Sequence, residues 1–283
     1  MFMTDTHVHI WNFERAYYEW LDNNTTILNR NYFIEELESE RKKAGITKGV
    51  LVQAANTLKE TAYMLDVAHQ TAWIKGVVGW LPLMDTKATE KILSQQYIHE
   101  PYIKGIRHLI HDEPDSKWLL QKEVMESLQL VADCQLAYDV VGILDEHLRC
   151  AIAVAEKIPS LKLVLDHMNH PMINRLLIST NWYALMKEAA KYPNIYVKIS
   201  GLGTCLENAS LSVENAMPYI AFVLETFSTD RCFCGGDWPV SLLANSYKKT
   251  WEIYTSVLAA LLDSEALKKV YDDNAANFYK LDL

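Results

Sequence analysis

The stretch Asp5-Thr6-His7-Val8-His9 opens the chain, and Trp11 follows two residues later. In an extended strand successive side chains point to opposite faces, so we expect Asp5, His7 and His9 on one face and Val8 on the other, apolar face. Two imidazoles one residue apart at the end of a strand can bind one divalent metal ion or polarise one substrate oxygen. A structural strand whose histidines bond to neighbouring groups is the alternative.

Short β-rich runs recur along the whole chain and alternate with helical segments. Several runs are nearly all apolar, which is typical of strands buried on both faces of a parallel sheet. Between residues 213 and 227, apolar residues keep the helical spacing of three and four, as expected of a helix face packed on a sheet. The β-rich runs are Thr4–His9, Gly49–Gln53, Gly76–Trp80, Gly105–His108, Leu136–Val141, Lys162–His167, Ile195–Ser200 and Arg231–Gly235.

This alternation predicts an α/β fold, a (β/α)8 TIM barrel that forms a single domain over residues 1–283. A doubly wound open sheet is the alternative. No Gly-rich turn follows an early strand and no P-loop motif occurs, so the sequence does not support a dinucleotide or nucleotide site. It also contains no linker or low-complexity tract that would divide the chain.

The composition limits the partners and the compartment. A net charge of -9 argues against nucleic acid or an anionic membrane, since little here would neutralise phosphates. No apolar run is long enough to cross a bilayer, and the first residues lead directly into a strand, so we expect no signal peptide. The five cysteines have no zinc-finger spacing, which favours reduced thiols in a cytoplasmic protein.

Polar residues recur at the ends of the predicted strands, where a (β/α)8 barrel places its functional groups. Each residue alone has a structural explanation, such as helix capping by Asp166 or a solvent-directed Lys198. Polar groups at the same end of strand after strand must nevertheless converge on partners. They are His7, His9, Gln53, Arg107, His108, Tyr138, Asp139, Asp166, His167, Lys198, Ser200 and Asp237.

The ordered motifs of the chain resemble the amidohydrolase superfamily. More narrowly, they are similar to the amidohydrolase-2 branch of L-fuconolactonase-, L-rhamnonolactonase- and 2-pyrone-4,6-dicarboxylate-lactonase-like enzymes. The resemblance spans nearly the whole chain and implies a (β/α)8 barrel with a hydrolytic site at the carboxyl ends of the strands. It is carried by residues 5–11, 104–108, 165–167, 198–202, 235–240 and 274–279.

The chain departs from the metal-dependent members of this superfamily at two strands. His7, His9, His167 and Asp237 match their ligand positions, whereas the fourth strand offers Arg107 in place of Lys or Glu. The fifth strand offers Tyr138-Asp139 and no histidine. A two-metal centre is therefore not expected. One Zn²⁺ or Mn²⁺ on His7, His9 and Asp237 and a site that needs no metal both stay open.

The resemblance implies hydrolysis of a sugar lactone. The attacking water must lose a proton, and the carboxylate of Asp237 is the expected general base. His7, His9, His167 and Arg107 would stabilise the developing oxyanion. The expected substrate-binding residues are Gln53, Asp139, Lys198, Trp238 and Trp11.

Two other functions stay open at this point. One is a metal-dependent decarboxylase or amide or ester hydrolase of the same branch. The other is a catalytically silent barrel that binds a small molecule. We expect a small-molecule substrate and a homodimer as the default assembly. Residues 201–208 are either a mobile flap or a plain surface loop.

Overall fold

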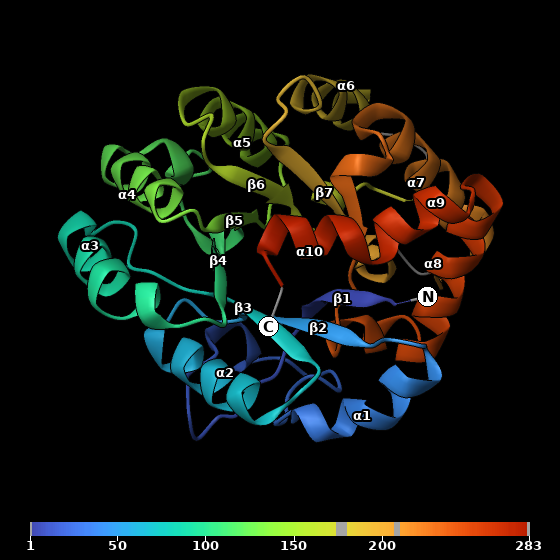
Figure 1. Cartoon of the computed structure of the whole chain (residues 1–283), viewed down its shortest axis with the longest axis horizontal. Helices are drawn as coiled ribbons and strands as arrows, with labels where there is room; N and C mark the ends of the chain where they lie inside the picture. Colours follow the sequence, from blue (N-terminus) through green and yellow to red (C-terminus); the bar gives the residue numbers. More distant parts are fainter. Residues whose placement is uncertain (1, 174–179, 207–209, 282–283) are drawn as a thin grey trace.

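The computed structural model describes residues 2–173, 180–206 and 210–281. Within them, parallel strands pair in chain order from β1 to β8, which confirms the (β/α)8 prediction (Figure 1). Each strand lies within about two residues of its predicted run. The strands are β1 Thr4–Val8, β2 Lys48–Val52, β3 Ile74–Gly79, β4 Ile103–His108, β5 Ala137–Val140, β6 Lys162–Leu165, β7 Ile195–Ile199 and β8 Cys232–Cys234.

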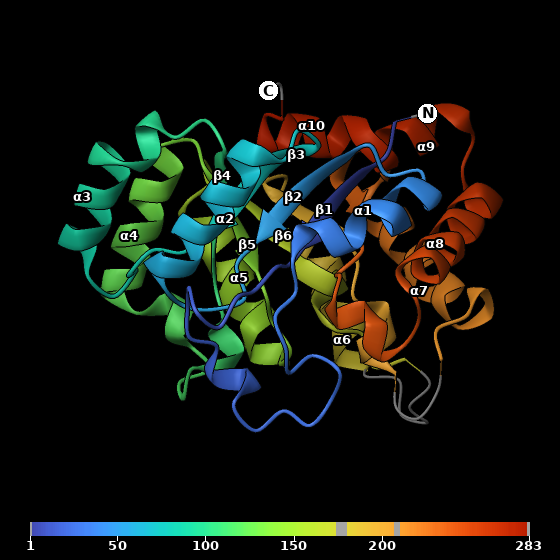
Figure 2. The same cartoon turned by 90° about the horizontal axis from the view of Figure 1, so that it is seen from below.

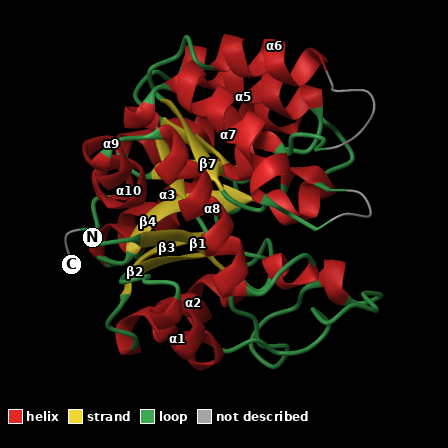
Figure 3. Ribbon diagram, turned by 90° about the vertical axis from the view of Figure 1, so that its right-hand side faces the viewer, coloured by secondary structure: helices red, strands yellow, loops and turns green. Residues whose placement is uncertain are grey.

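Helices surround the strands on the outside (Figure 3). The apolar pattern of residues 213–227 forms one helix, α7, whose Ile220 and Leu224 are buried. No helix among the described residues is both long and apolar enough to cross a membrane. The helices are α1 Ile34–Lys43, α2 Leu58–Gln70, α3 Thr86–Gln95, α4 Lys122–Asp133, α5 Asp145–Lys157, α6 Thr180–Ala189, α7 Val213–Phe227, α8 Tyr247–Leu261, α9 Ser264–Lys268 and α10 Asn274–Tyr279.

The sheet closes between β1 and the segment that follows β8. Val8 and Trp238 form a parallel bridge. The backbone N–H of His9 donates to the carbonyl of Trp238 at 2.7 Å, and the N–H of Asp237 donates to the carbonyl of His7 at 2.8 Å. These bonds rule out the open-sheet alternative and bring the histidines of β1 beside Asp237.

The two ends of the barrel differ. At the end where the strands begin, α10 packs Phe278 and Tyr279 against interior residues such as Val164 and Phe233. Figure 2 shows α9 and α10 on this side, with the long segment between β1 and α1 on the opposite side. The carboxyl ends of the strands therefore face the long loops, as the barrel hypothesis requires.

The side of β1 on which Asp5 lies differs from the prediction. The pairing register with β2 shifts between Asp5 and Val8, which breaks the simple alternation of faces. Asp5 lies against α8, where its carboxylate accepts hydrogen bonds from the Tyr247 hydroxyl at 2.7 Å and the Gly236 N–H at 2.7 Å. It also accepts the N–H of His7 at 2.9 Å. The prediction that Asp5 shares a face with His7 and His9 is therefore wrong.

Replacing Asp5 should weaken the closure of the sheet between β1 and the segment that follows β8. Asp5→Ala leaves two buried N–H groups and one hydroxyl without an acceptor, so we expect a loss of about 3 kcal/mol in the free energy of unfolding. Tyr247→Phe removes only one partner and should cost about 1 kcal/mol. Urea unfolding followed by circular dichroism measures both. Equal, small losses in the two variants would contradict the role given to Asp5.

Candidate active site

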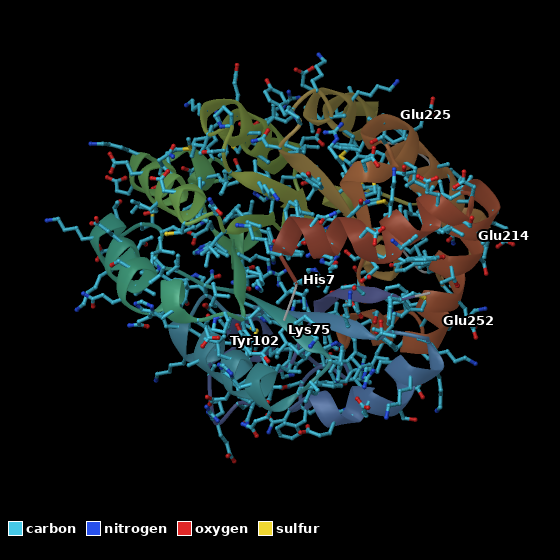
Figure 4. All side chains as sticks on the ribbon, viewed as in Figure 1. His7, Lys75, Tyr102, Glu214, Glu225 and Glu252 are labelled. Carbon is cyan, nitrogen blue, oxygen red and sulfur yellow. The ribbon has the colours of Figure 1, made fainter. Side chains whose placement is uncertain are left out.

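A cavity of about 190 Å³ lies at the carboxyl ends of the strands. Four of the predicted catalytic residues reach it, and the fifth, His7, is fully buried and contacts them. Figure 4 shows His7 near the centre of the barrel, far from the labelled surface residues Glu214 and Glu225. The cavity is lined by His9, Trp20, Ala54, Arg107, Leu109, His111, Val141, His167, His170, Thr204, Asp237 and Val240.

Asp237 is the carboxylate of this cavity, and three imidazoles surround it. Its Oδ1 lies 3.5 Å from His9 Nε2, 3.8 Å from His7 Nε2 and 4.0 Å from His167 Nε2. Burial on its own raises the pKa of Asp237, but the nearby His167 and His9 outweigh it and hold the pKa below the ordinary value. Asp237 is therefore ionised at neutral pH and can accept a proton.

The segment after β6 is a left-handed turn, which the sequence did not predict. The strand expected to reach His167 ends at Leu165, and residues 167–170 all have positive φ, between 50° and 54°. Such a conformation costs non-glycine residues about 1–2 kcal/mol each, and it is typical of functional sites. The turn directs His167 and His170 into the same cavity, with their ring centroids 5.4 Å apart.

The proton on His167 can be assigned from its partner Ser200. The fully buried Ser200 hydroxyl lies 2.9 Å from His167 Nδ1 and also accepts the backbone N–H of His167. Among the described residues, Nδ1 is the acceptor that the structure offers to this hydroxyl proton. Burial lowers the pKa of His167, so the ring is neutral and carries its proton on Nε2. His167 therefore presents an N–H donor near Asp237.

The two ring nitrogens of His9 and of His7 face different groups. His9 Nδ1 lies 2.7 Å from the carbonyl of Val52 and must donate to it. His7 Nδ1 lies 3.2 Å from the ammonium of Lys198, which can only donate. Burial lowers the pKa of His7 well below its usual value, so the ring is neutral. Its Nε2 lies 3.1 Å from His9 Nε2 and 3.2 Å from Arg107 Nη1, so a cation faces each nitrogen of His7.

Arg107 supplies a fixed positive charge at the cavity wall. Its Nη1 pairs with Asp166 Oδ2 at 3.0 Å, and its Nη2 donates to the backbone carbonyl of Gln53. Burial alone would raise the pKa of Asp166. The charge of Lys198, with smaller contributions from His7 and Arg107, instead holds it well below the usual value. Asp166 is therefore an anion that anchors Arg107.

Comparison with known proteins agrees with this geometry. The family model described as Amidohydrolase matches residues 4–281, which is nearly the whole chain. The chain belongs to the amidohydrolase family. It falls in the amidohydrolase-2 branch and is a hydrolase.

Three similar proteins illustrate the range of this amidohydrolase family. An L-fucono-1,5-lactonase of Burkholderia ambifaria is 30% identical, over 99% of this chain and 96% of the relative. An L-fucono-1,5-lactonase of Burkholderia multivorans is 26% identical, over 98% and 95%. A solved amidohydrolase structure from Burkholderia multivorans with bound zinc has a TM-score of 0.90 at 24% identity and covers 99% of each chain.

The predicted metal ligands of this amidohydrolase lie together, but two cationic side chains flank His7. Ligands of a tetrahedral zinc ion are separated by about 3.3 Å. The distances among His7, His9 and Asp237, from 3.1 to 3.8 Å, are close to this value. Lys198 Nζ, however, lies 3.2 Å from His7 Nδ1. Arg107 Nη1 also lies 3.2 Å from His7 Nε2 and adds a positive charge there. These two charges disfavour a tightly bound divalent cation on His7, although His7, His167 and Asp237 offer ligand atoms within 4.8 Å of one another.

None of the five predicted substrate-binding residues lines the cavity. Asp139 and Lys198 are fully buried and pair with each other at 2.7 Å. Gln53 is fully buried and donates to the backbone carbonyl of Arg107 at 3.2 Å. Trp11 and Trp238 pack against Tyr32, with ring centroids 5.2 and 5.4 Å away. Each of these side chains therefore contacts other buried groups and does not line the cavity.

Sequence reasoning missed four polar or aromatic residues of the cavity: Trp20, His111, His170 and Thr204. Trp20 comes from the segment between β1 and α1, and its indole N–H donates to the carbonyl of Ala54 at 2.8 Å. The position of His170, three residues after His167, was an available signal. Of the predicted flap, Thr204 reaches the cavity, whereas residues 207 and 208 lie outside the described ranges.

Gly201 offers a test of the His167 position. It has φ +60°, and a Cβ at this position would overlap His167 Nδ1. We expect Gly201→Ala to displace the imidazole and to lower kcat at least tenfold, on the order of one lost oriented donor. Gly45→Ala is the matched control, since Gly45 also has a positive φ but would meet only Met3 at 3.8 Å. Similar steady-state kinetics for the two variants would contradict the assignment.

Proposed function

We propose that this amidohydrolase opens the ring of a sugar lactone by attack of water on the ring carbonyl, with Asp237 as the general base. The observation that carries the proposal is an ionised Asp237 whose Oδ1 lies 4.0 Å from the N–H donor of His167, on a cavity that Arg107 also lines. The similarity to two L-fucono-1,5-lactonases supports the substrate class.

Asp237, His167 and Arg107 can each take one role in this reaction. Asp237 takes a proton from water as the water oxygen bonds to the carbonyl carbon. The His167 Nε2–H and the Arg107 guanidinium donate to the oxygen that becomes negative. The bond from the carbonyl carbon to the ring oxygen then breaks, and Asp237 returns the proton to that oxygen. The product is a hydroxy acid, which ionises and releases one proton to the solvent.

The remaining cavity residues suit a neutral, hydroxyl-rich ring. Burial lowers the pKa of His170 to about 3 and also lowers the pKa of His111, so both rings are neutral. Neutral imidazoles and the Thr204 hydroxyl can donate to and accept from sugar hydroxyls. Trp20 offers an indole, tied by its N–H, whose apolar surface can cover the C–H face of a sugar.

Acid release from a panel of aldonolactones tests the proposed function, with a pH indicator as the readout. Turnover of L-fucono-1,5-lactone or a related aldonolactone, above the spontaneous rate, is the expected result. If no lactone is hydrolysed by folded protein, the proposal fails and the decarboxylase and binding-barrel alternatives take its place.

Metal removal is a separate test. Because Lys198 and Arg107 place positive charge beside both ring nitrogens of His7, we expect kcat to stay unchanged after chelator treatment and dialysis. The metal content of each sample is measured by mass spectrometry. Activity that disappears on chelation and returns with Zn²⁺ or Mn²⁺ would contradict this expectation and place an ion at His7, His9 and Asp237.

Asp237→Asn tests the general base. Asparagine is nearly isosteric and tolerates the φ of 56° at this position, so the fold should be retained. We expect kcat to fall by about 10²–10⁴, which is typical of the loss of a positioned base. Asp133→Asn, an exposed change at the end of α4, is the matched control. Near wild-type turnover by folded Asp237→Asn would show that another group accepts the proton.

A further inference from the structure

Trp20 forms part of a wall between the catalytic cavity and a second hollow at the carboxyl ends of the strands. This second hollow, the polar groove, has a volume of about 610 Å³, against about 190 Å³ for the cavity. Trp20 and Leu109 line both spaces. Ala54 lines the cavity and the next residue, Ala55, lines the polar groove, so the two spaces lie back to back.

The side chain of Trp20 is fixed in this wall. Its indole N–H donates to the carbonyl of Ala54 at 2.8 Å, and its ring packs edge-to-face on Trp11 with ring centroids 5.4 Å apart. The buried carboxylate of Glu60 accepts the N–H of Ala54 at 2.9 and 3.0 Å and the N–H of Ala55 at 2.7 Å. The indole therefore has a braced position between the cavity and the polar groove.

The polar groove has the chemistry that binds a sugar ring. Asn56 and Thr57 line it with an amide and a hydroxyl, and Phe13 adds an aromatic ring that is 45% exposed. Amides and hydroxyls exchange hydrogen bonds with sugar hydroxyls, and an aromatic face can cover the C–H face of a sugar. Carboxylates outnumber cations among the charged residues of the groove, which disfavours an anionic ligand. These charged residues are Glu14, Glu19, Asp112, Glu113, Arg15 and Lys59.

We propose that Trp20 determines the size of the substrate: its indole ends the catalytic cavity, so the enzyme hydrolyses aldonolactones of a single sugar ring, and its removal joins the cavity to the polar groove and admits lactones that carry a second ring. This inference rests on the proposed function, because it specifies which lactones the cavity accepts. Trp20 selects by excluded volume, since a second ring directed towards the groove would overlap the indole.

Kinetics with paired substrates test the proposal. The single-ring substrate is L-fucono-1,5-lactone or the aldonolactone that wild type turns over fastest, and its partners carry one galactosyl group on each ring hydroxyl in turn. Wild type should hydrolyse the galactosyl lactones about a hundredfold less efficiently than the single-ring lactone, and Trp20→Ala should raise kcat/KM for at least one of them about tenfold or more, as relief of a clash in a pocket allows. An absolute gain is required, because loss of the indole also lowers kcat/KM for the single-ring lactone.

Three further variants make the kinetic test specific. Tyr17 lines the polar groove and not the cavity, so Tyr17→Ala should keep wild-type kcat/KM for every lactone. Trp20→Phe keeps a ring in the wall and should still exclude the galactosyl lactones. Leu109→Ala removes the other shared side chain and should admit a galactosyl lactone, which keeps the proposal testable if Trp20→Ala does not fold.

A binding measurement separates this proposal from the lactonase proposal. The compound 1,5-anhydro-L-fucitol has the sugar ring but no carbonyl, so it cannot be hydrolysed, and calorimetry compares it with its galactosyl derivatives. Wild type should bind the single ring alone, and Trp20→Ala should bind at least one galactosyl derivative. If this change in binding occurs but wild type hydrolyses no lactone, Trp20 limits the size of the ligand and the lactonase proposal fails.

Two results would overturn the role of Trp20, whether or not lactones are hydrolysed. One is rejection of every galactosyl compound by both Trp20→Ala and Leu109→Ala. The other is a wild type that already accepts a galactosyl compound as well as the single ring, which would show that the second ring leaves the cavity by another route. If wild type also hydrolyses a single-ring lactone, the lactonase proposal stands in either case.

Discussion

The site depends on the closure of β1 against the segment that follows β8. Two backbone hydrogen bonds, from His9 to Trp238 and from Asp237 to His7, complete the barrel. The same bonds place two imidazoles beside Asp237, the carboxylate among the described residues that line the cavity. Asp5 stabilises this closure, because its carboxylate accepts hydrogen bonds from the Gly236 N–H and from the Tyr247 hydroxyl of α8. The positions of His7, His9 and Asp237 are thus part of the closure of the fold.

The barrel interior contains two pairs of opposite charges where many such barrels contain apolar layers. Arg107 pairs with Asp166, and Lys198 pairs with both Asp166 and Asp139. Ion pairs in such positions are costly to desolvate and are weak evidence for stability. Their arrangement is better explained by the imidazole they surround, since the ammonium contacts one nitrogen of His7 and the guanidinium approaches the other.

The sequence was sufficient to predict the barrel because buried parallel strands and amphipathic helices have different periods, and this chain alternates them throughout. It also located His7, His9, Arg107, His167 and Asp237, because carboxyl ends of barrel strands converge. It could not show that Asp139 and Lys198 pair beneath the cavity, since a polar residue at a strand end can point to solvent, to substrate or to a buried partner.

Three other features depend on local backbone geometry or on distant contacts. The left-handed turn of residues 167–170 contains no glycine, so no residue type marked it. The register shift in β1 removed Asp5 from the face of His7 without any change in the hydrophobic pattern. Trp20 and His111 reach the cavity from long loops, whose paths are set by tertiary contacts such as the bond from Trp20 to Ala54.

The central claim is that water attacks the ring carbonyl carbon of a sugar lactone. Hydrolysis in ¹⁸O-labelled water tests this most directly, with mass spectrometry of the product after correction for spontaneous opening. Our account predicts that one ¹⁸O atom enters the new carboxylate and that none enters the hydroxyl released from the ring. Label in that hydroxyl would show cleavage at the other carbon–oxygen bond and would contradict the assignment of Asp237, His167 and Arg107 to the carbonyl.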